Sequence, residues 1–251
     1  MTASMENSDL SDRVVLITGG ARRVGAVLVR ALHAAGANVL VHYRSSSGAA
    51  IALAEELNRE RADSIVTHRA DLLEPEAPEQ LVAATLRAFG RLDVLVNNAS
   101  TFYPTPVGTI TSAQWDDLIG SNLKAPLFLS QAAVPSLRAS RGLIINIVDV
   151  HGLRPLKGHP LYSTAKAGLA MLTRSLAREL GPDIRVNGIA PGPVLWPEKN
   201  MDDALKKEII DKTALKRYGT PQDIARTLLF LAKDAPYITG QIIAVDGGRS
   251  I

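Results

Sequence analysis

VVLITGGARRVGAVLVRALHAAGANVLVHY, residues 14–43, is the stretch that decides the fold. It opens with the continuous apolar run Val14–Thr18, which is typical of a strand covered on both faces. After a turn at Gly19 and Gly20, apolar residues recur at the spacing of one helix face, at Val24, Val27, Leu28, Ala31, Leu32 and Ala35. Gly36 ends this helix, and a second strand covers Val39–His42. The stretch therefore predicts a βαβ unit with parallel strands.

The same alternation of strand and helix continues to the end of the chain. Five further apolar strands are predicted at Ser64–Thr67, Asp93–Asn97, Leu143–Val148, Ile184–Ile189 and Ile242–Val245. Helical patterns lie between them at Ala49–Arg61, Leu81–Phe89, Leu123–Leu137, Tyr162–Leu180 and Pro221–Leu231, and a capping box from Thr111 to Gln114 opens one more helix. The pattern predicts one α/β domain over residues 1–251, with a doubly wound parallel sheet. We expect a flexible N-terminus at 1–11 and an insertion covering the site at 191–217, where core patterning is weak.

Composition excludes several classes of function. Hydrophobic residues make up 46% of the chain and charged residues 21%, as in an ordinary globular protein. The formal charge of +3 and the pI of about 9.2 suit anionic small molecules, but no basic run indicates nucleic-acid binding. Cysteine is absent, so disulfides and thiolate metal sites are excluded. No cluster of ligands at metal spacing, no signal peptide and no membrane span is predicted, and we expect a cytoplasmic protein.

The first strand leads into the glycine-rich turn TGGARRVG, Thr18–Gly25. Glycines beside a helix N-terminus let the backbone approach a phosphate and present free N–H groups to it. The second strand ends in VHYRSSS, where Arg44, Ser45 and Ser46 suit a 2′-phosphate better than a free ribose hydroxyl. This predicts NADPH as the cofactor, the alternative being a solvated Arg44 in a polar loop.

Tyr162 and Lys166 are four residues apart and therefore lie on one face of the predicted helix. A neighbouring ammonium favours the phenolate, so we expect a lowered Tyr162 pKa and a phenol that exchanges protons near neutral pH. The alternative is a chance spacing, with Tyr162 half-buried and Lys166 solvated.

Over nearly its whole length the chain resembles the short-chain dehydrogenase/reductase family. The matching motifs are TGGARRVG at 18–25, Ala70–Asp71, NNA at Asn97–Ala99, Asn122, YSTAK at 162–166 and Pro191–Gly192. The resemblance implies a Rossmann fold with strand order 3-2-1-4-5-6-7, helices on both faces, and a homotetramer. It implies that Asp71 contacts adenine, that Asn98 and Ala99 support the adenosine, and that Asn122 holds a proton-relay water. Tyr162 becomes the acid/base, and Lys166 holds the nicotinamide ribose and lowers the phenol pKa. The cofactor site that it implies is made of Gly19, Arg22, Arg23, Val24, Tyr43, Arg44, Ser45, Asp71, Leu72, Asn98, Ala99, Ser100, Tyr162, Lys166, Pro191, Gly192 and Val194.

Departures from the family pattern point to one branch. The family has a serine thirteen residues before the tyrosine, where this chain has Asp149, and a glycine where it has Arg23. NNAG reads NNAS with Ser100, and the following loop reads STFYPTP, Ser100–Pro106. Together these resemble the pteridine reductases.

The expected substrate is therefore a flat pteridine, reduced at a C=N bond with proton delivery by Tyr162 and Asp149. Phe102 is expected to stack on one face of the ring while nicotinamide covers the other. The substrate residues expected are Arg23, Ser100, Phe102, Asp149, Tyr162, Leu195 and Trp196. Plainer roles stay open: Phe102 packing beneath a loop, Asp149 capping a helix, and Arg23 binding phosphate alone. His151 and His159 are interpreted as ordinary loop residues.

Two other functions stay open. One is an NADPH-dependent reductase of ketones or 3-oxoacyl groups, which would have to act without the usual serine. The other is a non-catalytic NADPH-binding sensor, against which the intact Asn122, Tyr162 and Lys166 weigh.

Overall fold

The computed structural model describes residues 9–195 and 202–251, and these contain a seven-stranded, wholly parallel sheet. The strand order is β3-β2-β1-β4-β5-β6-β7, which confirms the predicted sheet. The strands are β1 (Val14–Ile17), β2 (Asn38–Tyr43), β3 (Ile65–Arg69), β4 (Val94–Asn97), β5 (Leu143–Ile147), β6 (Arg185–Pro191) and β7 (Ile242–Val245). The chain reverses direction across the sheet between β1 and β4, where doubly wound folds bind ligands.

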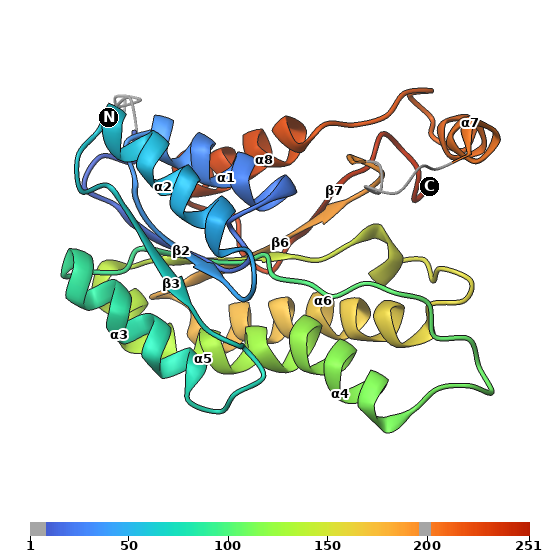
Figure 1. Ribbon diagram of the computed structural model, residues 1–251, viewed down its shortest axis with the longest axis horizontal. Helices are drawn as coiled ribbons and strands as arrows, with labels where there is room; N and C mark the ends of the chain where they lie inside the picture. The colour runs from blue at the N-terminus through green and yellow to red at the C-terminus, as the bar shows by residue number, and fades with distance from the viewer. Residues whose placement is uncertain (1–8, 196–201) are drawn as a thin grey trace.

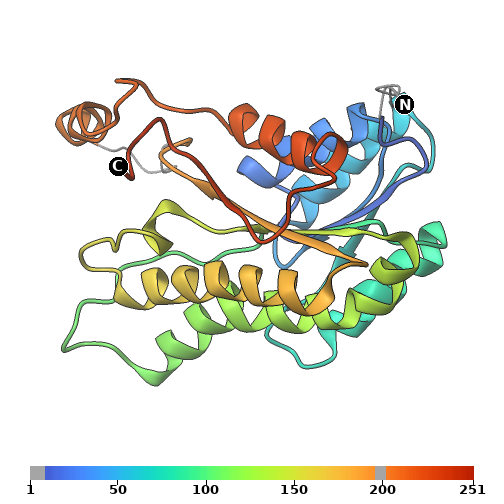
Figure 2. The same cartoon turned by 180° about the vertical axis from the view of Figure 1, so that it is seen from behind.

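Helices cover both faces of the sheet (Figures 1 and 2). One face carries α1 (Arg23–Ala34), α2 (Ser47–Glu60) and α8 (Pro221–Lys233). The other carries α3 (Ala77–Phe89), α4 (Ser112–Ile119), α5 (Ala125–Ser140) and α6 (Pro160–Leu180). Helix α7 (Asp203–Asp211) stands apart from these helices, beyond the end of β6. No helix in the described part of the chain is long and apolar enough to cross a bilayer.

The central strands are apolar throughout because they are buried on both faces. Successive side chains point to opposite faces, so Val15 and Ile17 pack against α1 and α8 while Leu16 packs against α3 and α5. The sheet thus separates two apolar cores and fixes the carboxyl ends of its strands in one row.

Several boundaries differ from those predicted. Helix α3 begins at Ala77 rather than Leu81, with Pro78 in the first turn, where its missing N–H costs nothing. Helix α6 begins at Pro160 rather than Tyr162 for the same reason. The N-terminal segment expected to be flexible is packed from Leu10, which is buried and donates a backbone hydrogen bond to Ala35.

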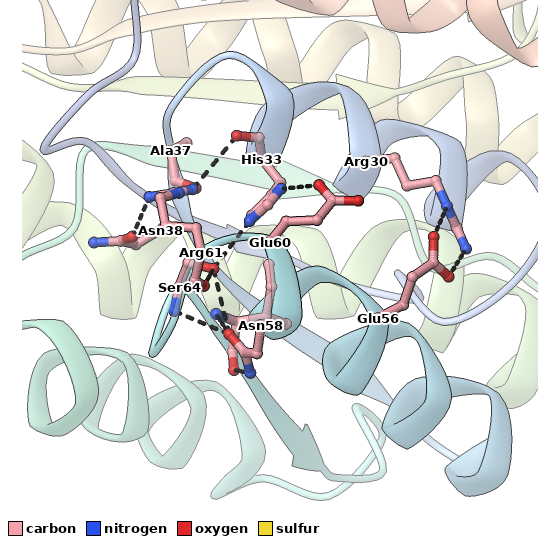
Figure 3. A network of polar contacts seen from close by, with 10 residues as sticks. Arg30, His33, Ala37, Asn38, Glu56, Asn58, Glu60, Arg61 and Ser64 are labelled. Atoms are coloured by element: carbon pink, nitrogen blue, oxygen red, sulfur yellow. Dashed lines mark hydrogen bonds and ion pairs between the residues drawn. The ribbon is translucent and has the colours of Figure 1, made fainter.

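A cluster of polar residues lies where strands β2 and β3 begin, at the end of the sheet away from the carboxyl ends of its strands (Figure 3). The Arg61 guanidinium donates to Asn38 and to the carbonyl of Ala37, and His33 Nε2 lies 3.0 Å from Ser64 Oγ. Ser64 donates to the Arg61 carbonyl and has an exposed fraction of 1%, so it is a structural hydroxyl. The cluster ties α1 and α2 to the starts of β2 and β3.

Candidate active site

A cavity of about 670 Å³ runs along the carboxyl ends of β1, β2, β4, β5 and β6. Residues from the glycine-rich turn, the end of β2, the β4 and β5 loops and the end of β6 share its walls. Of the predicted cofactor and substrate residues, its lining contains Gly19, Arg22, Arg23, Val24, Tyr43, Arg44, Ser45, Asp71, Leu72, Asn98, Ala99, Ser100, Phe102, Asp149, Tyr162, Lys166, Pro191, Gly192, Val194 and Leu195. Asn122 lies beside the cavity, hydrogen-bonded to Ser100. Trp196 lies outside the described residues.

The glycine-rich turn is held open beside the N-terminus of α1. Gly19 has φ of 62°, and a Cβ placed on Gly25 would lie 2.2 Å from the Gly19 carbonyl oxygen, so neither position tolerates a side chain. Asn98 Nδ2 donates to the carbonyls of Thr18 and Gly19 at 2.9 and 3.0 Å. The result is a bare backbone concavity at a helix N-terminus, which fits a phosphate group.

Arg23 occupies this turn in a backbone conformation that favours glycine. Its φ is 54°, and a side chain in this left-handed region costs roughly 1–2 kcal/mol. Arg23 is also one of the residues that line the cavity, so the strained backbone lies at the candidate site. Strained residues of this kind concentrate at functional sites.

We expect Arg23→Gly to be more stable than Arg23→Ala by about 1 kcal/mol, because both variants lose the side chain but only glycine relieves the backbone. Urea unfolding of the two variants measures the difference. Equal stability would show that the turn is not strained at this residue.

His42, inside β2, joins two of the loops that line the cavity. The Gly19 N–H donates to His42 Nδ1 at 3.2 Å, so Nε2 carries the proton and donates to the Ala70 carbonyl at 3.1 Å. Burial, opposed by the bond to Ala70, lowers the His42 pKa from 6.5 to about 4. The neutral ring holds the glycine-rich turn against the loop that begins at Asp71.

Because the pKa of His42 is lowered in the folded protein, we expect the fold to lose stability in acid. Well above pH 6.5, His42 is neutral in both the folded and the unfolded chain. As the pH falls from 6.5 toward 4, the unfolded chain binds a proton at His42 before the folded chain does, so the free energy of unfolding decreases. At pH 4.5 the loss amounts to roughly 2 to 3 kcal/mol relative to pH 7.5. Urea unfolding at both pH values should show a smaller loss for His42→Asn than for the parent. A His151→Asn control that reduced the loss equally would contradict the assignment.

The most specific contact in the cavity joins Tyr162 and Asp149. The Tyr162 hydroxyl donates to Asp149 Oδ2 at 2.8 Å, and Asp149 Oδ1 accepts the backbone N–H of His151 at 2.8 Å. Tyr162 has an exposed fraction of only 5%, so the contact lies in a poorly hydrated site. Asp149 is oriented by its own turn, Val150–Gly152, and it presents its second oxygen to the phenol.

The expectation of a lowered phenol pKa is wrong for this arrangement. Burial, the Asp149 charge and the hydrogen bond to it raise the Tyr162 pKa well above 10, and the nearby Ser100 hydroxyl opposes them only in part. Lys166 Nζ donates to the Ile147 carbonyl at 2.9 Å and lies 5.7 Å from the centre of the Tyr162 ring. Burial lowers the Lys166 pKa to about 8. Because burial and the Asp149 carboxylate both raise its pKa, Tyr162 is a neutral phenol.

Asn122 lies in a π-helical turn, Gly120–Lys124, which joins the end of α4 to the start of α5. Its amide donates to the carbonyls of Leu118 and Thr101, and its Oδ1 accepts from Ser100 Oγ at 2.6 Å. Single π-turns of this type occur frequently at functional sites. The amide thereby fixes the loop after β4, which carries Ser100 and Phe102.

Phe102 projects into the cavity with 56% of its surface exposed. Its ring meets Tyr162 edge to face, with centroids 4.8 Å apart, and it stacks on His159 at 4.7 Å and 7°. This exposure disfavours the plainer alternative, in which Phe102 only packs beneath a loop. An exposed aromatic face next to an acid is suited to a flat ligand.

Comparison with known proteins agrees with this geometry. A family profile described as "Enoyl-(Acyl carrier protein) reductase" matches residues 19–250. Pteridine reductase 1 of Leishmania tarentolae is 38% identical, covering 95% of this chain and 96% of the relative. The chain belongs to the short-chain dehydrogenase/reductase family. Within the family it is also 36% identical to 3-oxoacyl-(acyl-carrier-protein) reductase FabG of Staphylococcus epidermidis, over 94% of this chain and 98% of the relative.

A solved structure extends the likeness to three dimensions. It is described as a blue fluorescent protein from a metagenomic library in complex with NADPH. It superimposes with a TM-score of 0.91 at 36% identity, and covers 97% of this chain and 100% of its own. The chain is accordingly an oxidoreductase of the short-chain dehydrogenase/reductase family, and these similarities do not separate pteridine from 3-oxoacyl substrates.

The sequence motifs do not predict the contacts that His42 and His159 make at this site. His42 is a polar residue within the otherwise largely apolar strand β2, and this contrast is the feature of the sequence that could indicate a hydrogen-bonding role. His159 was interpreted as an ordinary loop residue, and only the folded loop shows that it meets Phe102.

Proposed function

We propose that the protein is an NADPH-dependent reductase of pteridines. The observation that carries the proposal is the 2.8 Å contact between Tyr162 and Asp149, beside the exposed ring of Phe102. A carboxylate at this position suits protonation of a ring nitrogen better than hydrogen bonding to a carbonyl oxygen.

The walls of the cavity fit the cofactor. The bare turn at Gly19 and Gly25 would take the pyrophosphate, and Arg44 and Ser45, which line the cavity after β2, would bind the 2′-phosphate. Asp71 and Leu72 form the adenine end, and Lys166 reaches the nicotinamide end. When bound, NADPH supplies the hydride for the reduction.

The chain's own residues supply the proton. Tyr162 stays protonated because burial and Asp149 raise its pKa, so it is a donor rather than a base before the reaction. After donation, a phenolate beside Asp149 is unfavourable, which drives rapid reprotonation. The hydrogen bonds through Ser100 to Asn122 give a polar route to the phenol.

In this proposal Phe102 gives the substrate one flat wall, and Arg23 and Ser100, which line the same cavity, contact polar edges of the ring. Leu195, 36% exposed, forms part of the wall after β6. The segment 191–217, which includes α7, is proposed to cover the bound substrate.

Turnover of dihydrobiopterin or dihydrofolate with NADPH, followed by loss of absorbance, tests the proposal. Simple ketones serve as the comparison substrates in the same assay. We expect the pteridine to have the higher kcat/KM. Brisk turnover of a ketone with none of either pteridine would overturn the assignment.

A second candidate is a reductase of ketones or 3-oxoacyl groups, favoured by the similarity to FabG. That activity would proceed without the family's serine at position 149. A ketone kcat/KM above that for dihydropteridines in the parent enzyme would select it.

We propose a homotetramer as the working assembly. Trp115, Phe128 and Met171 expose apolar side chains on α4, α5 and α6, a face suited to packing against other subunits. Light scattering of the purified protein gives the subunit number.

A further inference from the structure

His159, in the loop that precedes Tyr162, stacks on Phe102. Phe102 belongs to the cavity lining and His159 does not. The two rings are nearly parallel, 7° apart with centroids 4.7 Å apart. His159 therefore covers one face of the Phe102 ring and is not itself part of the cavity lining.

Besides the stack on Phe102, the imidazole contacts the backbone of its own loop. His159 is the N-cap residue of α6, but its side chain makes no capping hydrogen bond. Its Nδ1 lies 3.1 Å from the Lys157 carbonyl, which can only accept, so this nitrogen donates and fixes the plane of the ring. The ring is thus oriented by its own loop and presented flat to Phe102.

The same two loops are joined by a backbone contact. The Thr105 N–H, in the loop that carries Phe102, donates to the Gly158 carbonyl at 2.7 Å. Thr105 is fully buried, so this junction is a fixed point next to the stacked rings. Tyr162 follows His159 by three residues, and its ring meets Phe102 edge to face. The Phe102 ring therefore contacts both His159, face to face, and the proposed proton donor Tyr162, edge to face.

We propose that His159 is a positioning residue that holds Phe102 ready for a flat aromatic substrate and so contributes to specificity against aliphatic ketones. The proposal rests on the proposed function for its substrate class. A half-exposed phenylalanine in a loop would otherwise lose side-chain freedom each time a ligand binds, and the imidazole removes that freedom beforehand.

Kinetics of three variants test the role. His159→Leu should raise KM for dihydrobiopterin about fivefold, the size expected of one aromatic contact, with kcat changed less than twofold. His159→Phe restores a stacking ring and should return KM to the parent value. Lys157→Leu, an exposed change in the same loop, should have no effect. KM for an aliphatic ketone should be the same in all four proteins.

A measurement without substrate separates this inference from the proposed function. The chain has four phenylalanines, so fluorine-19 spectra of protein labelled with 4-fluorophenylalanine contain four resonances, and Phe102→Leu assigns one of them. That resonance should move toward the solvent-exposed value in His159→Leu and stay in place in His159→Phe and Lys157→Leu. An unmoved resonance in His159→Leu overturns the positioning role. If the resonance moves while the parent enzyme turns over no pteridine, the positioning role stands and the proposed function falls.

Discussion

Tyr162→Phe is expected to lower kcat for the pteridine roughly 10²- to 10⁴-fold, the range for loss of a general acid. The variant keeps the ring that packs with Leu118 and Leu161, and it loses only the hydroxyl bonded to Asp149. NADPH affinity should stay within about twofold, because the phenol donates to a side chain of the protein itself. Steady-state kinetics and a fluorescence titration of NADPH give the two quantities.

Tyr237→Phe is the matched control, since Tyr237 is fully exposed and its loss of hydroxyl should change neither kcat nor stability. A kcat of Tyr162→Phe within tenfold of the parent would exclude Tyr162 as the proton donor.

Asp149→Asn is expected to lower kcat for the pteridine about 100-fold and to move the basic limb of the pH–rate profile to lower pH. The amide has a single oxygen, which still accepts the N–H of His151, while its NH2 group faces the Tyr162 hydroxyl and donates to the phenol oxygen, so the shape of the site is kept while the charge and one acceptor are lost. Removing the carboxylate charge takes away one of the causes that raise the Tyr162 pKa, and burial remains. The pH dependence of kcat in both proteins measures the shift.

Asp149→Ser is the informative companion. A serine hydroxyl donates to a carbonyl oxygen, so ketone turnover should rise while pteridine turnover falls. Asp183→Asn, at an exposed ion pair with Arg138, controls for loss of a carboxylate elsewhere. An unmoved basic limb in Asp149→Asn, or equal losses for both substrates, would show that Asp149 has only a structural role.

Much of the fold was predictable because it depends on local patterns. The capping box from Thr111 to Gln114 forms as predicted, with the Thr111 N–H donating to Gln114 at 3.0 Å. Each motif follows a predicted strand, and parallel strands end on the same edge, so Gly19 and Asp149 meet in one cavity. The order of the sheet follows from the resemblance to a family and not from periodicity alone.

Other features escaped prediction because they depend on tertiary contacts. Helix α7 lies in a segment with little core patterning, and Ile209 and Ile210 are only partly buried. The raised Tyr162 pKa follows first from burial and then from a carboxylate thirteen residues away in sequence, whereas the sequence draws attention to Lys166 one turn along the helix. The π-turn at Asn122 depends on hydrogen bonds to the loop after β4.

The central claim is that a flat heterocycle lies over the reduced nicotinamide and is protonated by Tyr162 with the help of Asp149. A crystal structure of the protein with NADPH and an antifolate such as methotrexate tests it most directly. We predict that the pteridine ring lies between Phe102 and the nicotinamide, with a ring nitrogen within hydrogen-bonding distance of Asp149 or Tyr162. A ring bound elsewhere, or Phe102 turned out of the cavity with Asp149 far from the ligand, would contradict the account.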